Sequence, residues 1–516
     1  MDHPSGMTRR TLIGSGGAVL AAASAPDVLL DIGTALAAGP SSGIRYFARF
    51  GVTEPMLREA LGAALSRGGD AADVFFQHRV GTSLSLEDGA VNSAYTSVEL
   101  GVGVRVLKGD QTGYGYTEEL TREALLRTAK TAAAIADGPA KPGPKGFRGE
   151  TIAKDRYPVR RRWDEVKSDE KLPLLKSLNA KALAADKRIR KVNVEFSDEA
   201  SVLLLADSSG RIVEDAQPMT TLWLGCVAEQ DGRRESGGYN LAARSDMGFY
   251  TPERLSRTVS EAVGRTTVLF EAIQPPAGEM PVVLGAGASG ILLHEAIGHG
   301  MEADFNRKNV SIYADRIGKP IAPKFVSIVD DGTQEHFRGA LNVDDEGNPA
   351  GRTLLVENGI LATYLHDTLS AKHYGVRPTG NGRRESYKYA PMPRMRSTYM
   401  LPGPHKKDEI VASVKKGIFC ANFTNGQVQI GAGDFTFYVK NGWLIEDGKL
   451  TRPIKDVNII GNGPKVLEKV DMVADDITHD EGGWTCGKNG QGVPVSMGIP
   501  TVRVASITVG GRGEKG

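Results

Sequence analysis

Two histidines and a glutamate lie close together near the middle of the chain, in the segment His294-Glu295-Ala296-Ile297-Gly298-His299. Two imidazoles and a carboxylate on one short helix are what a hydrolytic zinc site needs. The imidazoles can hold the ion, and the glutamate can take a proton from the attacking water. The pattern therefore predicts His294 and His299 as metal ligands and Glu295 as the catalytic base.

The spacing of the two histidines is unusual for a helical metal site. Histidines four residues apart, as in the common HExxH form, are separated by about 40° around a helix. His294 and His299 are five residues apart, which is roughly 140° on a regular helix. We therefore expect the helix either to widen in a π-like turn or to end before His299. Gly298 and Gly300 flank His299, and we expect their backbone freedom to allow this break.

The third ligand is not settled by the residues alone. Glu302 and Asp304 follow His299 closely and could complete a site within one segment. Cys486 lies in a glycine-rich loop whose backbone could approach an ion closely, and a thiolate is a good zinc ligand. His479 is a weaker choice in the same part of the chain.

A glycine pattern of the dinucleotide-binding type, Gly285-Ala286-Gly287-Ala288-Ser289-Gly290, directly precedes the histidine motif. The helix that follows is too short for that fold, and no second parallel strand ending in an acidic residue is evident. We expect these glycines to serve tight packing between a strand and a helix, and nucleotide binding is rejected.

The first 40 residues have the features of an export signal. The twin-arginine segment Thr8-Arg9-Arg10-Thr11-Leu12-Ile13 leads into an apolar run, and Ala35-Leu36-Ala37 offers a small-residue cleavage site. Pro26, Asp27 and Asp31 interrupt the run, so no stable membrane span is expected. The sequence predicts export by the twin-arginine route, to the periplasm or another extracytoplasmic compartment.

Composition excludes some classes of partner. The 516 residues include 63 basic and 62 acidic side chains, for a net charge of +1, so no overall field favours nucleic acid or an anionic membrane. Three cysteines are too few for a disulfide framework.

The order of expected elements indicates an α+β fold. Helices are expected over 54–67, from a cap at Thr117 to about 136, from Ser168, and from the Thr251-Pro252-Glu253 start. Alternating apolar strands lie between them, with a hairpin at Asp88-Gly89.

A proline- and glycine-rich stretch near residue 275 marks the expected boundary between two domains. The predicted organisation is a leader over 1–40, an amino-terminal α+β domain over 41–274, and a β-rich carboxyl-terminal domain over 275–512. We expect each domain to have a largely antiparallel sheet with flanking helices, and the metal-site helix to lie in the second domain.

Four motifs in order resemble the TldD/PmbA family. They are His294-Glu295-Ala296-Ile297-Gly298-His299-Gly300, Gly380-Asn381-Gly382-Arg383-Arg384-Glu385-Ser386-Tyr387, Pro391-Met392-Pro393-Arg394-Met395 and Cys486-Gly487-Lys488. The resemblance covers most of the chain after the leader and is to the TldD branch, which keeps the metal motif.

This resemblance implies a zinc-dependent peptidase that acts on unfolded peptides or small proteins. It implies His294, His299 and Cys486 as zinc ligands and Glu295 as the base. The resemblance also implies a homodimer or a heterodimer with a PmbA/TldE-like subunit that lacks the HExxxH motif, although an export leader puts a cytoplasmic partner in doubt.

Cationic groups near such a site could stabilise the oxyanion or hold a peptide carboxylate, and Arg383, Arg384, Arg394 and Tyr387 are the candidates. Two alternatives stay open. One is a metal-binding but inactive scaffold subunit. The other is a closed structural zinc site with Cys420 or Cys226 as a fourth ligand.

Overall fold

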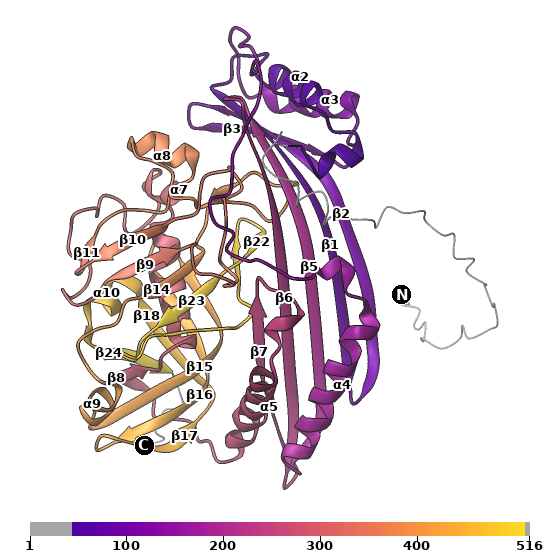
Figure 1. The fold of residues 1–516 in the computed structure, drawn as a ribbon. Coiled ribbons are helices and arrows are strands. Elements are labelled where there is room, and N and C mark those ends of the chain that lie inside the picture. The colour runs from indigo at the N-terminus through magenta and orange to yellow at the C-terminus, as the bar shows by residue number, and fades with distance from the viewer. Residues whose placement is uncertain (1–43, 511–516) are drawn as a thin grey trace, which may run out of the picture.

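The computed structural model describes residues 44–510 and shows a mixed α+β fold, as the sequence predicts (Figure 1). The expected leader over 1–40 lies outside the described residues. Among the residues that the structure describes, no helix is long and apolar enough to cross a membrane.

A large, mostly antiparallel sheet forms the amino-terminal part, in the order β3-β2-β1-β5-β6-β4, with β7 also paired to β6. Four strands of 17 to 20 residues make up most of it: β1 (Ala71–Glu87), β2 (Ala90–Lys108), β5 (Ile189–Asp207) and β6 (Arg211–Gln230). The shorter strands are β3 (Gln111–Thr117), β4 (Arg148–Gly149) and β7 (Arg233–Ala243). The predicted hairpin at Asp88-Gly89 joins β1 to β2, and both residues have positive φ.

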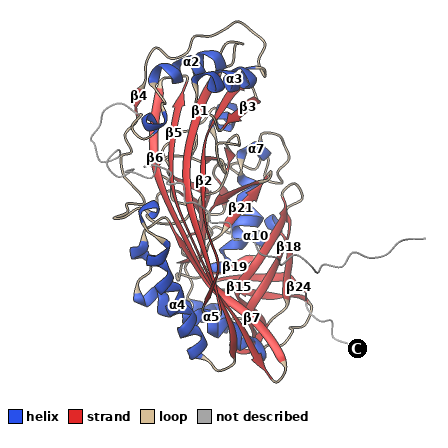
Figure 2. Ribbon diagram, turned by 90° about the vertical axis from the view of Figure 1, so that its right-hand side faces the viewer, coloured by secondary structure: helices blue, strands red, loops and turns tan. Residues whose placement is uncertain are grey.

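Four helices cover one face of this sheet, two at each end of the long strands (Figure 2). They are α2 (Glu54–Ala64), α3 (Arg122–Ala133), α4 (Ser168–Ala185) and α5 (Pro252–Thr267). The opposite face carries Phe75 and Leu203 and packs against Val343 and Tyr387 of the carboxyl-terminal part. The sheet therefore joins its own helices on one side and the rest of the molecule on the other.

The sequence predicts helix caps at Thr251 and Thr117, and the structure tests both. Thr251 accepts a hydrogen bond from the Arg254 amide and begins α5, as expected. The predicted cap at Thr117 is wrong. Thr117 ends β3, and the cap of α3 is Thr121, whose Oγ1 accepts from the Ala124 amide. The extra residues let β3 finish its pairing with β2 before the helix begins.

The carboxyl-terminal part contains two larger sheets. One has the order β15-β8-β24-β18-β16-β17 with β19 beside β24, and the other β11-β10-β9-β14-β23-β20. The first sheet comprises β8 (Gly278–Leu284), β15 (Lys416–Gln429), β16 (Asp434–Glu446), β17 (Lys449–Ile454), β18 (Val457–Asn462), β19 (Val470–Val473) and β24 (Val502–Gly510). The second comprises β9 (Ile328–Asp331), β10 (Arg352–Glu357), β11 (Ile360–Leu361), β14 (Ser397–Met400), β20 (Thr478–His479) and β23 (Ser496–Ile499).

Two short hairpins and five short helices complete this part. The hairpins pair β12 (Gly382–Arg383) with β13 (Met392–Pro393), and β21 (Thr485–Lys488) with β22 (Gln491–Pro494). The helices are α6 (Ile291–Leu293), α7 (Ala303–Asn306), α8 (Thr368–Tyr374), α9 (Lys407–Ala412) and α10 (Gly463–Glu468).

The glycine segment after β8 serves close packing, as expected. A Cβ on Gly290 would stand 2.8 Å from the Gly498 backbone nitrogen in β23, and one on Gly285 would stand 2.8 Å from Phe419 in β15. The segment therefore wedges the start of the motif helix between the two larger sheets.

Candidate metal centre

A π-helical turn carries the two histidines. The short helix α6 widens into a π turn over His294–Gly298, and a 3₁₀ turn follows over His299–Met301. The His299 amide donates to the His294 carbonyl, which is the five-residue hydrogen bond of a π turn. The first of the two expected solutions to the spacing is therefore confirmed, and both imidazoles lie together with ring centroids 5.0 Å apart.

The flanking glycines do a different job from the one expected. Gly298 has φ −58° and ψ −51°, an ordinary helical conformation, and Gly300 is not among the residues with positive φ. The expectation of special backbone freedom is therefore wrong. A Cβ on Gly298 would stand 2.0 Å from Met395 Sδ, and one on Gly300 would stand 2.5 Å from the Tyr313 ring. Close approach of neighbouring side chains requires both glycines.

Three potential ligand atoms converge at this turn. Single ligand atoms of His294, His299 and Cys486 all lie within 4.8 Å of one another, and all three residues are buried. His299 Nε2 is 3.4 Å from Cys486 Sγ. Cys486 belongs to β21, so a hairpin almost 200 residues further along the chain brings the thiol to the helix.

The electrostatics favour the metal-binding form of Cys486. Burial alone would raise the pKa of the Cys486 thiol, but His294 and His299 outweigh burial and lower it well below its usual value. The thiolate is the form that binds a metal. The buried Nδ1 of His294 has no hydrogen-bond partner among the described residues. Two imidazoles and a thiolate form a donor set that fits zinc.

Glu302 lies behind His299 rather than beside the ligand atoms. Its Oε2 is 3.0 Å from His299 Nδ1, the ring nitrogen opposite the one that faces Cys486. The carboxylate is fully buried. Burial would raise its pKa, but Lys488 and His299 outweigh burial and lower it to about 2. A charged carboxylate on Nδ1 orients the imidazole and holds the proton there, which frees Nε2 for a metal.

The other residues weighed as ligands lie elsewhere. Asp304 Oδ1 accepts from Lys488 Nζ at 2.7 Å, and His479 packs between the rings of Phe337 and Tyr399. Within the described chain, the convergent group includes neither Cys420 nor Cys226. The closed four-ligand site is therefore contradicted by the structure.

Glu295 differs from its neighbours in the motif because it is only half-buried. Burial raises the pKa of its carboxyl group, while His294 and His299 oppose that shift. Its Cγ approaches the backbone of Gly426 in β15, 3.5 Å from the position that a Cβ would take there. Glu295 thus combines partial exposure with proximity to the ligand group.

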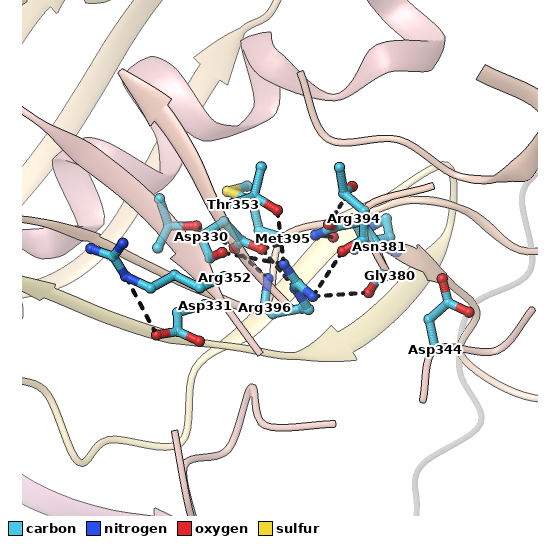
Figure 3. A network of polar contacts seen from close by, with 12 residues as sticks. Asp330, Asp331, Asp344, Arg352, Thr353, Gly380, Asn381, Arg394, Met395 and Arg396 are labelled. Atoms are coloured by element: carbon cyan, nitrogen blue, oxygen red, sulfur yellow. Dashed lines mark hydrogen bonds and ion pairs between the residues drawn. The ribbon is translucent and has the colours of Figure 1, made fainter. Parts of the chain in front are cut away.

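A buried polar network positions the segment that packs on the π turn (Figure 3). Asp330 accepts hydrogen bonds from the Arg396 amide and guanidinium and from Asn381 Nδ2. This anchor lies directly after Met395, which packs against Gly298, and after Arg394, which contacts the cysteine hairpin. Arg394 Nη2 donates to the Cys486 carbonyl at 2.5 Å. The network therefore links the Pro391–Met395 motif to the cysteine motif.

Models of one protein family match almost the whole described chain. The PmbA/TldA metallopeptidase domain 1 matches residues 72–136, the central domain matches 161–269, and the C-terminal domain matches 277–511. The chain belongs to the PmbA/TldD metallopeptidase family.

Relatives within this family are named as metalloproteases. The metalloprotease TldD homolog of Haemophilus influenzae is 40% identical over 452 residues, covering 86% of this chain and 93% of that one. The metalloprotease TldD homolog of Buchnera aphidicola subsp. Acyrthosiphon pisum is 38% identical over 462 residues, covering 88% of this chain and 95% of that one. The family relationship supports a metalloprotease function.

Solved structures share the fold at low sequence identity. TldE from Thermococcus kodakarensis superposes with a TM-score of 0.67 at 18% identity, covering 89% of this chain and 99% of that one. A Bacteroides thetaiotaomicron protein superposes with a TM-score of 0.70 at 21% identity, covering 89% and 98%.

The three arginines and the tyrosine predicted to bind substrate lie in three different places. Arg394 lies at the ligand group, as described above. Tyr387 donates its hydroxyl to Glu118, and Arg384 donates to the Asp345 carbonyl and Tyr114, so both join the carboxyl-terminal part to the large sheet. Arg383 donates to the carbonyls of Met395 and Pro494 and faces a separate cavity.

Two residues near the centre have roles that the sequence reasoning missed. Glu302 was considered as a ligand but orients His299, and its three-residue spacing from His299 was the available signal. Lys488, two residues after Cys486, donates to Asp304 and lies 3.1 Å from Glu302. No sequence pattern indicated that contact, since it depends on the hairpin meeting the helix.

Proposed function

We propose that this protein is a zinc-dependent peptidase in which His294, His299 and Cys486 hold the ion and Glu295 is the general base. The observation that carries the proposal is the convergence of these three ligand atoms around a π turn, with Glu295 half-exposed beside them. A bound zinc ion would supply Lewis-acid activation of a water molecule and of the scissile carbonyl.

The residues of the chain divide the remaining work. Glu295 takes a proton from the attacking water and returns it to the leaving amine nitrogen, and burial raises the pKa of its carboxyl group, which makes it a stronger base. Glu302 fixes the orientation of His299 through Nδ1. Arg394 fixes the cysteine hairpin through the Cys486 carbonyl. We infer that the substrates are unfolded peptides or small proteins, because the family resemblance implies such substrates.

We further propose the setting in which this activity operates. The twin-arginine motif in the first 40 residues supports export, and that route carries proteins that are already folded and metal-loaded. We also propose assembly either as a homodimer or with a PmbA/TldE-like subunit, as the family resemblance implies.

The decisive experiment compares two substitutions for metal content and peptide cleavage. Glu295→Gln is expected to keep one zinc per chain and to lower cleavage of an unstructured peptide at least 100-fold, because proton transfer contributes about 10²–10⁴ to such rates. Cys486→Ala is expected to lose zinc. The matched control Glu279→Gln alters an exposed glutamate of β8 and should retain both zinc and cleavage.

Elemental analysis and mass spectrometry of the products read out both properties. Persistent cleavage by Glu295→Gln would remove Glu295 as the base, and unchanged zinc in Cys486→Ala would move the third ligand. A wild-type protein that cleaves no unstructured peptide, alone or with a related subunit, would favour the inactive scaffold.

A further inference from the structure

A second cavity lies on the other side of the hairpin that carries Cys486. Its volume is about 360 Å³, and it lies between the helix-free face of the large sheet and the carboxyl-terminal part. Side chains alternate across β21, so buried Cys486 faces the metal centre while exposed Thr485 faces this cavity. Pro494, the partner of Thr485 in β22, also lines it. The metal centre and the cavity therefore share one wall.

Three arginines in this cavity bond only to neutral oxygens. Arg244 donates to Gln217 Oε1 at 3.1 Å and to the Arg338 carbonyl at 3.2 Å. Arg338 donates to the Trp484 carbonyl and to Thr485 Oγ1, and Arg383 donates to two carbonyls. Among residues 44–510, no carboxylate oxygen lies within 4.0 Å of any of these three guanidinium groups, which is the distance at which an ion pair is counted.

The carboxylates that line the same cavity are already engaged. Glu199 pairs with Arg79 at 3.7 Å, Asp345 accepts from the Arg384 amide, and Glu385 accepts from the Gly492 amide. Five arginines and three carboxylates line the cavity in all, which leaves an excess of positive charge. The three unpaired guanidinium groups hold that excess.

The environment disfavours these cations in the absence of a ligand. Burial and the neighbouring Arg244 lower the pKa of Arg338 to about 10 and that of Arg383 to about 9. Arg244 and Arg383 are 4% and 3% exposed, so water screens their mutual repulsion poorly. Arg244 keeps unused donors, because its guanidinium has five N–H groups and only two acceptors. An anion would relieve the repulsion and fill these donors.

An apolar wall adjoins the cationic one. Phe75, Leu203, Met219 and Leu341 line the cavity together with the arginines. A ligand that joins a planar anion to an apolar side chain would satisfy both walls, and guanidinium groups bind carboxylates as a two-pronged fork.

We propose that this cavity binds the free α-carboxylate of a peptide whose last side chain is apolar, with Arg244, Arg338 and Arg383 as the carboxylate-binding residues. The choice of a peptide rests on the proposed peptidase function, whereas the carboxylate site rests on the cavity alone. Arg338 also donates to the Trp484 carbonyl and to Thr485 Oγ1. A carboxylate bound to Arg338 would therefore lie beside the hairpin that supplies Cys486.

Calorimetric titration of the zinc-loaded Glu295→Gln protein tests the site without cleavage of the probe. The probes are N-acetyl-Ala-Leu as the free acid, the same dipeptide as its carboxyl-terminal amide, and inorganic phosphate. We expect the acid to bind at least tenfold more tightly than the amide. Arg244→Met should abolish that preference, and Arg244→Lys should restore part of it.

A matched control is Arg79→Gln, which alters an arginine of the same cavity that is paired with Glu99 and Glu199 and should leave the preference within threefold. Equal binding of acid and amide, or an unchanged preference in a folded Arg244→Met protein, would overturn the proposal. Phosphate binding as tight as that of the dipeptide acid would overturn the peptide assignment. These outcomes do not depend on catalysis, so failure here is distinct from failure of the peptidase proposal.

Discussion

The two faces of the β21–β22 hairpin differ in the partners of the buried cationic side chains next to them. On the Cys486 face, Lys488 lies 3.1 Å from the carboxylate of Glu302 and 2.7 Å from that of Asp304, and Arg394 is 4.0 Å from Glu302. On the Thr485 face, Arg244, Arg338 and Arg383 contact only neutral oxygens.

This difference separates positioning from binding. A buried cation beside a carboxylate is satisfied within the protein and can hold a metal ligand in place, because breaking such a pair exposes an uncompensated charge. A buried cation without a carboxylate has no partner for its charge until an anion binds beside it. On the Cys486 face of the hairpin, buried cations therefore have carboxylate partners within the protein. On the Thr485 face, three arginines at the cavity have none within the described chain.

The largest expected effect follows from removing the Glu302 carboxylate on the Cys486 face of the hairpin. Glu302→Leu leaves Arg394 without its carboxylate and His299 Nδ1 without an acceptor. We expect the free energy of unfolding of the metal-free protein to fall by about 3–5 kcal/mol, as for other broken buried pairs. Urea unfolding followed by circular dichroism measures it.

Asp304→Leu is the control for that substitution, because Asp304 is less buried and leaves the Glu302–Lys488 pair in place. It should lose less than half as much stability. Equal losses in the two variants would contradict a special role for Glu302. With metal present, Glu302→Gln should lower zinc affinity about 10–100-fold, as expected for a residue that orients a ligand.

A smaller effect is expected from adding a methyl group at a glycine in each of two places, one at the metal centre and one on the open face of the hairpin. Gly298→Ala would place a Cβ 2.0 Å from Met395 Sδ, so Met395 must move. Gly487→Ala is the counterpart on the open face of the hairpin, where a Cβ would have no neighbour within 4 Å. We expect Gly298→Ala to cost about 1–3 kcal/mol of stability and Gly487→Ala to cost less than about 0.5 kcal/mol.

Thermal and urea unfolding of both glycine variants checks this comparison, with Gly298→Ala/Met395→Ala as the rescue. If Met395 is the obstacle, the double variant should lose less stability than the sum of the two single variants. Additive losses would mean that Gly298 is needed for its backbone rather than for space.

The sequence predicted the parts of this arrangement that depend on local rules. The five-residue spacing of His294 and His299 required either a π turn or a helix end before His299, because helix geometry dictates where two side chains point, and the structure has the π turn. The threonine, proline and glutamate at 251–253 marked the start of α5 for similar local reasons. The cap at Thr117 failed because pairing of β3 with its neighbour overrode a local signal.

The parts that depend on tertiary contacts were out of reach. Residue types alone left Glu302, Asp304 and Cys486 as candidates for the third ligand, and only the family resemblance singled out Cys486. The role of Gly298 depends on Met395, which lies far along the chain. Arg244 and Arg338 carry no pattern at all, because their lack of carboxylate partners exists only once the sheet and the hairpin have packed together.

The smallest expected effect concerns Arg244 on the Thr485 face of the hairpin. Arg244→Met removes a buried cation that has no carboxylate partner, so the loss of its two hydrogen bonds is offset by the relief of charge repulsion and desolvation. We expect the free energy of unfolding to change by less than about 1 kcal/mol. Lys488→Met on the metal face is the matched comparison and should be clearly destabilising, because it leaves buried Glu302 without its nearest cation. If Arg244→Met destabilises the ligand-free protein as much as Lys488→Met does, Arg244 is a structural residue, and the two faces of the hairpin do not differ in kind.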